Sequence, residues 1–200
     1  GKDPSFSFDT AVPFGLNARQ MNAWMQEGNG TKLLRELFAT RNIINFAFGN
    51  TGTQMGGWYR KEINSLEDLK GLKMRTAGFA GEVLARMGVV PQQVPPGDIY
   101  PSLEKGTLDA VEFVGPVDDE KLGFQKVAKY YYYPGWWEGS AQVSLYVNDA
   151  AFNALPKQYQ SLIEIASRAA GERMICQYDA QSPGALRRLI ASGAVLKAFP

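Results

Sequence analysis

Arg75 is the side chain in this sequence best placed to bind an anion. It lies within 72–76, a segment that predicts a β-strand, and a glycine follows at Gly78. In parallel sheets, ligands bind beyond the carboxyl ends of the strands. A guanidinium there can hold a carboxylate through two parallel hydrogen bonds. The alternative is a surface arginine in an ordinary salt bridge, and position alone leaves both interpretations open.

Glu112 ends another predicted strand, at 108–114, and is a candidate metal ligand. A charged carboxylate in an apolar strand is costly unless it is paired or binds a cation. It is therefore either the partner of a nearby Lys or Arg or a ligand. Gln54, in the glycine-rich turn at 49–57, can add an amide oxygen. Two side-chain oxygens and a backbone carbonyl suit Na⁺ or Ca²⁺ better than zinc.

The aromatic run at 130–138 offers a third set of candidates. Two adjacent tryptophans in a strand face opposite ways, so one can pack in the core while the other lines a cleft. We expect the four tyrosines to be core or interface residues and Trp136, Trp137 and Glu138 to be nearer a cleft, since Pro134-Gly135 indicates a bend. Glu112 and Glu138 also suggest a rival function, a carboxylate-based glycoside hydrolase or carbohydrate-binding protein with tryptophans stacking on a sugar.

The composition excludes several other chemistries. The 200 residues contain no histidine, which removes Ser-His-Asp and Cys-His catalysis and the commonest zinc ligand. The single cysteine cannot form an intrachain disulfide within this sequence. A net charge of +1 gives no electrostatic case for nucleic acid or a membrane surface. No loop of the G-x-x-x-x-G-K-[ST] type is present.

The elements that must position these residues alternate along the chain. Strands are predicted at 6–12, 43–48, 72–76, 92–94, 108–114, 130–133 and 141–147. Helices are predicted at 17–27, 31–40, 65–71, 80–87, 99–105 and 118–127, and from Pro156 to a break at 182–184 that precedes a last helix. The strand-helix-strand-helix-strand order over 72–114 favours a parallel sheet with crossover helices.

These motifs together resemble a known family. The sequences at 74–76, 78–81, 97–106, 108–110, 112–115, 118–123 and 131–140 resemble those of the extracytoplasmic solute-binding subunits of TRAP transporters, DctP type. The last stretches are most similar to the subgroup that binds 2-oxoacids such as pyruvate, or lactate, with a metal ion. The resemblance covers nearly the whole chain.

The resemblance implies an α/β, two-lobe periplasmic binding protein fold with two crossing hinge strands and a long C-terminal helix, truncated here at both ends. It implies a first lobe from 1–48 and 116–135, and a second from 49–115 and 136–155. A helical segment at 156–200 would pack across both. Closure is expected near 48–50 and 114–116.

The resemblance also implies the function and the site. It implies capture of a small monocarboxylate without catalysis, in the periplasm, for TRAP membrane subunits, and a homodimer is compatible with it. The expected ligand contacts are Arg75, Asn50, Phe14, Trp136, Trp137 and Glu138. The expected ligands of a Na⁺ or Ca²⁺ ion are Gln54, Glu112, Phe113 through its backbone oxygen, and Glu138.

Overall fold

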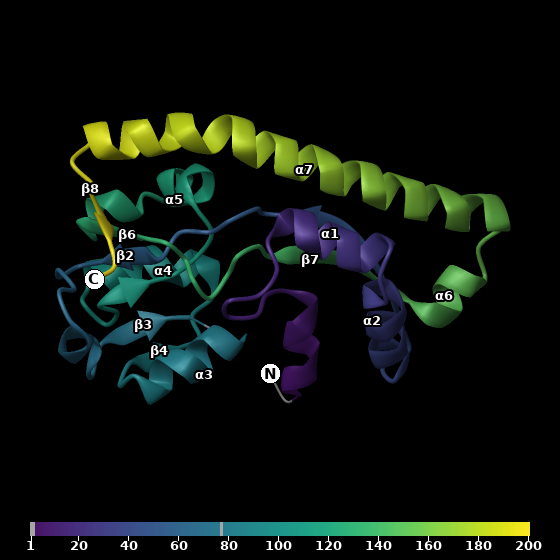
Figure 1. The fold of residues 1–200 in the computed structure, drawn as a ribbon, viewed down its shortest axis with the longest axis horizontal. Helices are drawn as coiled ribbons and strands as arrows, with labels where there is room; N and C mark the ends of the chain where they lie inside the picture. Colours follow the sequence, from purple (N-terminus) through teal and green to yellow (C-terminus); the bar gives the residue numbers. More distant parts are fainter. Residues whose placement is uncertain (1–2, 77) are drawn as a thin grey trace.

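The computed structural model describes residues 3–76 and 78–200 as a mixed α/β fold (Figure 1). The strands are β1 (Ile43–Asn50), β2 (Gly57–Tyr59), β3 (Lys73–Arg75), β4 (Val90–Gln92), β5 (Ala110–Val111), β6 (Tyr130–Tyr133), β7 (Gln142–Asn148) and β8 (Val195–Ala198). The α-helices are α1 (Ala18–Gln26), α2 (Gly30–Ala39), α3 (Gly78–Arg86), α4 (Pro96–Glu104), α5 (Pro116–Leu122), α6 (Asp149–Asn153) and α7 (Lys157–Ala191). Short 3-10 helices are η1 (Pro4–Asp9), η2 (Leu66–Leu69) and η3 (Phe124–Lys126).

The larger sheet has the strand order β4-β3-β5-β2-β6-β8. β3 pairs in parallel with β4 and β5, which confirms the parallel unit predicted over 72–114. β2 is antiparallel to both β5 and β6, so the sheet as a whole is mixed. Its two faces are filled by separate apolar clusters, one around Tyr59 and Met74 and the other around Trp58 and Tyr131. Because Arg75 ends β3 and Glu112 follows β5, this core holds their backbone in place.

The smaller sheet contains only β1 and β7, which pair antiparallel from Ile43↔Asn148 to Asn50↔Gln142. Its register shifts between Ala47 and Gly49, so β1 carries an irregularity near its carboxyl end. A third apolar cluster, formed mainly by α1 and α2, lies beside this sheet. α1 begins with a capping box in which Asn17 and Gln20 exchange hydrogen bonds.

The sheet pairings differ from the lobe boundaries expected from the sequence. β6 lies in 116–135, which we expected to accompany 1–48, but it pairs with β2 and β8 of the larger sheet. β7 lies in 136–155, which we expected to accompany 49–115, but it pairs with β1. The physical reason is that the chain crosses between the two sheets after β6, so each segment hydrogen-bonds to the sheet opposite the expected one.

α7 is one continuous helix of 35 residues, and the predicted break at 182–184 is wrong. Figure 1 shows it running along one side of the molecule, from α6 to the strand β8. It contacts β1 and α5, and so touches both sheet regions. Buried Ala185 and Leu189 follow Pro183 within two turns, and their packing outweighs the backbone hydrogen bond that a proline removes. Among the described residues, no helix is long and apolar enough to cross a membrane.

The segment at 6–12 is not a strand, although its residues alternate. Pro4 to Asp9 form η1 instead, because Pro4 fits the first helical turn and the Asp3 carboxylate accepts a hydrogen bond from the Ser5 N–H. Asp9 then accepts hydrogen bonds from Ser144 and Tyr146 of β7. Side-chain hydrogen bonds therefore set the conformation of this segment more strongly than its apolar period.

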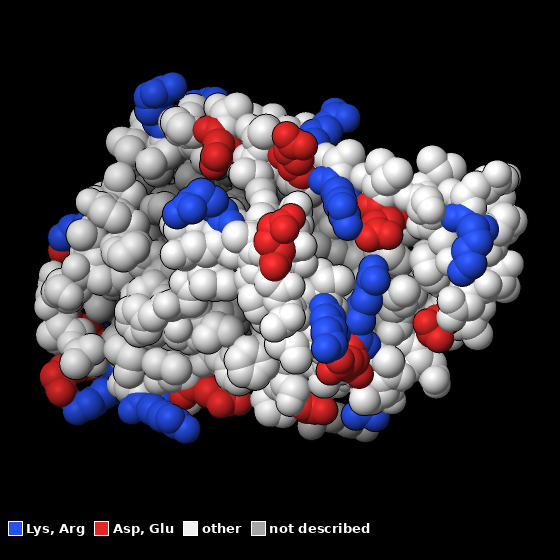
Figure 2. Space-filling view, turned by 45° about the vertical axis from the view of Figure 1, so that its right-hand side comes forward, with Lys and Arg blue, Asp and Glu red and all other residues white. Residues whose placement is uncertain are grey.

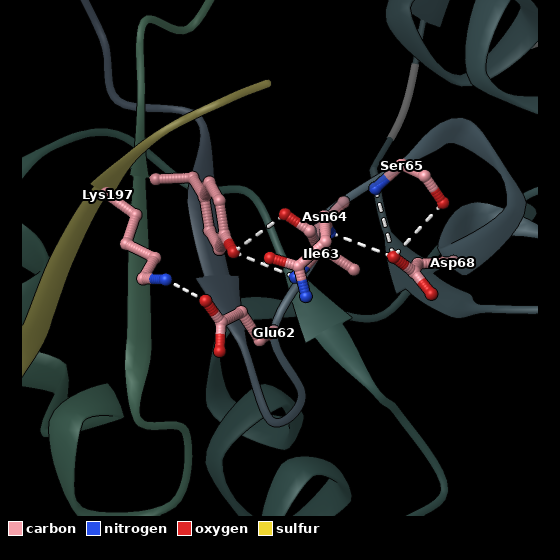
Figure 3. Close-up of polar contacts among 7 residues, drawn as sticks. Glu62, Ile63, Asn64, Ser65, Asp68 and Lys197 are labelled. Atoms are coloured by element: carbon pink, nitrogen blue, oxygen red, sulfur yellow. Dashed lines mark hydrogen bonds and ion pairs between the residues drawn. The ribbon is translucent and has the colours of Figure 1, made fainter.

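Polar contacts fasten the end of the chain to the segment before β3 (Figure 3). Lys197 of β8 forms an ion pair with Glu62. The Asp68 carboxylate accepts hydrogen bonds from the backbone of Asn64 and Ser65 and forms a capping box at the start of η2, within the helix predicted at 65–71. Charges on the face in Figure 2 are interspersed in sign, in keeping with the net charge of +1.

Candidate ligand and cation site

Arg75 ends β3 with its guanidinium against the segment that follows β5. Nη1 donates a hydrogen bond to the backbone oxygen of Glu112 over 2.7 Å and lies 3.7 Å from the Glu112 carboxylate oxygen Oε2. The guanidinium carbon is 5.4 Å from the centroid of the Phe113 ring. The Arg75 side chain is 20% exposed, and the remaining N–H groups have no partner among the residues that the structure describes. The guanidinium is thus anchored on one side and retains donors for a ligand.

Glu112 is almost fully buried beside this guanidinium. Its backbone N–H donates to the Arg75 oxygen over 3.0 Å, so the two residues are also joined through the main chain. Burial raises the pKa of the Glu112 carboxyl well above its usual value; the charge of Glu138 raises it further, and Arg75 opposes both. Oε1 has no hydrogen-bond partner among residues 3–76 and 78–200. A buried carboxylate oxygen without a partner is costly, which is expected of a group that binds something.

Gln54 brings an amide oxygen to the same region. Its side-chain nitrogen Nε2 donates to the Thr51 hydroxyl over 3.1 Å, while its buried Oε1 has no partner in the described part of the chain. Its backbone N–H donates to the Glu138 oxygen over 3.3 Å, and the next N–H, that of Met55, donates to the Val114 oxygen over 3.1 Å. The turn carrying Gln54 therefore bridges the segments that carry Glu112 and Glu138.

Glu138 is the second carboxyl of the cluster. Burial raises its pKa to about 7, and the charge of Arg75 opposes that shift. Its position depends on Gly135, whose N–H donates to the Gln54 oxygen. A Cβ at Gly135 would lie 2.7 Å from the backbone oxygens of Gln54 and Met55. Only glycine allows the bend to approach this closely, so the Pro134-Gly135 signal in the sequence has a physical basis.

We expected both tryptophans to lie near the cleft, but the structure buries Trp137 in the core while Trp136 is partly exposed. Trp137 is buried in the apolar cluster around Tyr59, and its Nε1 has no partner within the described residues. Trp136 stacks on the Phe14 ring at a centroid distance of 5.1 Å, and the Phe14 N–H donates to the Trp136 oxygen. Phe14 is 81% exposed. Phe14 and Trp136 therefore form an aromatic pair near Glu138, and the buried Trp137 contacts the Trp136 ring edge-on at a centroid distance of 4.7 Å.

Asn50 directly precedes Thr51, whose hydroxyl accepts the hydrogen bond from Gln54. Asn50 Oδ1 accepts a hydrogen bond from the Gly52 N–H, and its buried Nδ2 has no partner among the described residues. It lines a cavity of about 710 Å³ between α1, α2, β1 and α7, whose lining does not include Arg75, Glu112 or Glu138. The structure thus brings together Arg75, Glu112, Phe113 and Glu138, joins Gln54 to the Glu138 segment through backbone hydrogen bonds, and places Asn50 on the lining of another cavity.

Two polar side chains near the site, those of Thr76 and Thr51, were not predicted from the sequence. Thr76 follows Arg75 and is buried, with a hydroxyl that has no partner in the described chain. Thr51 holds Gln54 and also accepts a hydrogen bond from the Ala141 N–H. Thr76 is adjacent in sequence to Arg75 and Thr51 to Asn50, two residues that were predicted to contact the ligand. This adjacency is the sequence feature that could have indicated them.

The donor set fits a hard cation. Glu112 and Glu138 carry two negative charges when both are ionised and Arg75 one positive charge, so the fully ionised cluster has a net charge of −1, which a bound cation would offset. Unpartnered oxygens of Glu112 and Gln54 are the ligand type that Na⁺ and Ca²⁺ prefer. No group of three or more His, Cys, Asp or Glu side chains suited to a metal occurs among the described residues. A cation here would therefore need amide, backbone or ligand oxygens as well.

Comparisons with known proteins agree with this chemistry. The chain is 51% identical over 98% of its length to a monocarboxylate 2-oxoacid-binding periplasmic protein of Nostoc sp. (strain PCC 7120). It is 59% identical, with a TM-score of 0.98, to a TRAP transporter solute-binding protein from Bordetella bronchiseptica RB50, described as a mixed-occupancy dimer with copurified calcium and picolinate in an active site and with an apo site. It is 43% identical, with a TM-score of 0.96, to a TRAP periplasmic solute-binding protein from Pseudoalteromonas atlantica T6c with bound sodium and pyruvate.

The chain is shorter than these relatives. It spans 54% of the Nostoc protein, and it covers 60% and 61% of the Bordetella and Pseudoalteromonas chains, while all of its own residues match both structures. The model of the bacterial extracellular solute-binding proteins, family 7 (DctP), matches residues 1–200. The chain therefore belongs to the DctP family of bacterial extracellular solute-binding proteins.

Proposed function

We propose that the protein to which this chain belongs captures a small monocarboxylate, a 2-oxoacid such as pyruvate or else lactate, together with Na⁺ or Ca²⁺. The observation that carries the proposal is the contact between Arg75 and Glu112 in a buried cluster where Oε1 of Glu112 and Oε1 of Gln54 have no partner among the described residues. Relatives at 43% to 59% identity bind pyruvate or picolinate with sodium or calcium.

Arg75 would hold the carboxylate of the acid. Its Nη1 already donates to the Glu112 backbone, which fixes the plane of the guanidinium. The remaining N–H groups of the planar guanidinium can then donate two parallel hydrogen bonds to the oxygens of a carboxylate. The Phe113 ring beneath the guanidinium further limits its rotation. An orientation set before the ligand arrives reduces the entropy lost on binding.

Glu112, Gln54 and the backbone oxygen of Phe113 would hold the cation, with Glu138 close by. When bound, a cation supplies positive charge that offsets the two carboxylates and attracts the oxygens of the acid. An anionic ligand next to two ionised carboxylates would otherwise be repelled. The Trp136–Phe14 pair would cover the apolar part of the ligand.

Two units of the chain would close around the ligand. One contains the six-stranded sheet with Arg75 and Glu112, and the other contains β1, β7 and the helices α1 and α2. The chain passes between them near 48–50, where the β1 register is irregular, and after β6. We propose that these crossings are the hinge, that α7 spans both units, and that the closed form is delivered to TRAP membrane subunits in the periplasm. A homodimer is part of this proposal.

The rival glycoside hydrolase has no support in these observations. Glu112 and Glu138 converge on one arginine, since Arg75 lowers the pKa of both. Carboxyls of a glycosidase face each other across the sugar instead. The family and the Nostoc relative are described as binding proteins.

Equilibrium binding to the full-length protein tests the proposal. Chelator-treated protein would be titrated with pyruvate and lactate, each with and without added CaCl₂ or NaCl, and with a neutral sugar as the control ligand. We expect saturable binding of at least one acid that tightens when the cation is added, and none of the sugar. Binding of the sugar, or of neither acid under any condition, would contradict the proposal.

A further inference from the structure

The short helix η1 lies where the two proposed units meet, on the side of the molecule away from α7. In Figure 1 it is the purple segment beside the N-terminal label, with α7 along the opposite side. It contacts α2 and β7, which belong to one unit, and α3, which belongs to the other. The proposed closure involves α7 and the strand crossings and gives η1 no role.

Two sets of contacts fasten η1 to the unit that contains β7 and α2. Asp9, at the end of η1, is 1% exposed; its Oδ1 accepts a hydrogen bond from the Ser144 hydroxyl over 2.9 Å and its Oδ2 accepts one from Tyr146. The Phe6 ring packs against the Phe38 ring of α2 with centroids 5.0 Å apart. Withdrawing a buried carboxylate from two donors is costly. We therefore expect η1 to move together with β7 and α2.

Phe8 of the same helix reaches the other unit. Its ring centroid lies 5.0 Å from that of Phe79, with the ring planes tilted by 59°. Phe79 lies in the first turn of α3, which contacts β4 and buries Ala80 in the apolar cluster around Tyr59. A Cβ on Gly78 would lie 3.7 Å from the Ser7 hydroxyl oxygen, so η1 approaches the start of α3. The Phe8–Phe79 pair thus connects the two units.

The pair has the properties of a contact that can form and break. Phe8 is 49% exposed and is not part of the three apolar clusters found in the described chain. Aromatic rings at this distance attract each other modestly beyond the area that they bury. Separating Phe8 from Phe79 would therefore cost little and would leave the cores of both units intact.

The position of the pair relates it to ligand release. Phe79 follows Arg75 by four residues, so the proposed ligand arginine and α3 belong to the same unit. α7 spans both units on one side, and η1 meets α3 on the other (Figure 1). Opening at the strand crossings would separate η1 from α3. The geometry points to Phe8 and Phe79 as a latch that stabilises the closed form and slows release of the bound acid. The inference rests on the proposed closure around a ligand.

The rate of pyruvate dissociation tests the latch, measured by stopped-flow displacement from the full-length protein with saturating Ca²⁺. We expect this rate to rise about three- to tenfold in Phe8→Ala and in Phe79→Ala, with the association rate within about twofold of the wild type. The double variant should release pyruvate no faster than the faster single variant, because both substitutions remove the same contact.

Tyr159→Ala is the matched control. Tyr159 lies in the first turn of α7 and is as exposed as Phe8, at 49%. We expect its dissociation rate to stay within about twofold of the wild type, since it removes an exposed ring away from η1 and α3. Phe8→Asp keeps the latch testable if Phe79→Ala does not fold. It changes only a half-exposed position and should accelerate release at least as much as Phe8→Ala.

Three results would overturn the latch while the proposed function stands. They are a wild-type dissociation rate in folded Phe8→Ala, a double variant whose acceleration equals the product of the two single effects, and an equal acceleration in Tyr159→Ala. A wild-type protein that binds neither pyruvate nor lactate would show instead that the proposed function is wrong, and the latch would be wrong with it.

Discussion

Arg75 and Glu112 are joined twice over, once through the side chain and once through the main chain. Arg75 Nη1 donates to the Glu112 oxygen over 2.7 Å, and the Glu112 N–H donates to the Arg75 oxygen over 3.0 Å. The second contact belongs to the junction of the parallel strands β3 and β5. The guanidinium and the carboxylate therefore cannot separate without disturbing the sheet, and the anion-binding and cation-binding halves of the proposed site are one unit.

Glu112→Gln should remove cation dependence while leaving the fold in place. The substitution keeps two polar atoms but deletes the charge, and we expect Ca²⁺ affinity to fall about 100-fold, or ~2.8 kcal/mol. Because burial raises the pKa of Glu112, the neutral side chain should not lower thermal stability at pH 7. Calorimetric titration with CaCl₂ measures the affinity. Glu104→Gln, an exposed acid at the end of α4, is the control, and equal Ca²⁺ affinity in the Glu112 variant and the wild type would contradict the assignment.

Stability of the protein without ligand or cation should fall as pH rises. Burial raises the pKa of Glu138 from 4.5 to about 7, and that of Asp119 from 3.8 to about 7. A carboxyl with a raised pKa binds its proton more tightly in the folded state. It therefore stabilises the fold at low pH, and this stability is lost as pH rises through the folded-state pKa. The chain has no histidine to titrate in the same range.

Urea unfolding between pH 5 and pH 8 measures this slope. Glu138→Gln should flatten it, and Ca²⁺ with pyruvate should reduce it by stabilising the ionised carboxylates. A stability that rises steadily over the same range in the ligand-free wild type would show that these carboxyls are ionised at lower pH than their burial implies.

Pro183→Ala should stabilise the protein. Pro183 is exposed in the interior of α7, where a proline costs up to ~3 kcal/mol relative to alanine. The proline also restricts the unfolded chain, which offsets about 1 kcal/mol of that gain. We expect a net increase of about 2 kcal/mol in the free energy of unfolding. Gly184→Ala is the matched neighbour and should gain less, up to ~1 kcal/mol. A less stable Pro183→Ala protein would mean that α7 packing needs the local geometry of the proline.

Local signals in the sequence predicted much of the architecture. Helices begin near 17 and 65 as predicted, and each has a capping box formed by residues three apart. The strands at 72–76 and 108–114 are shorter than predicted but form the expected parallel pair. The cluster of Arg75, Glu112, Gln54 and Glu138 follows from their places at strand ends and turns.

Interactions between distant residues account for the predictions that were wrong. The alternation at 6–12 indicated a strand, but Asp9 bonds to β7, more than 130 residues away. Pro183 indicated a break, but tertiary packing of Ala185 and Leu189 maintains the helix. The lobe boundaries depended on which sheet β6 and β7 join, and no local pattern encodes that choice. The burial of Asp119 was not predicted from the sequence, and it is seen only in the structure.

The most direct test of the account is the pyruvate affinity of Arg75→Ala, measured by calorimetry on the full-length protein with saturating Ca²⁺. Arg86→Ala, at the exposed end of α3, controls for loss of a positive charge, and Arg75→Lys keeps the charge without the planar fork. Loss of a buried, hydrogen-bonded charge partner costs 2–5 kcal/mol or more, so the account predicts binding weaker by about 100-fold or more in Arg75→Ala. It predicts a smaller loss in Arg75→Lys and wild-type affinity in Arg86→Ala. Wild-type affinity in a folded Arg75→Ala protein would contradict it.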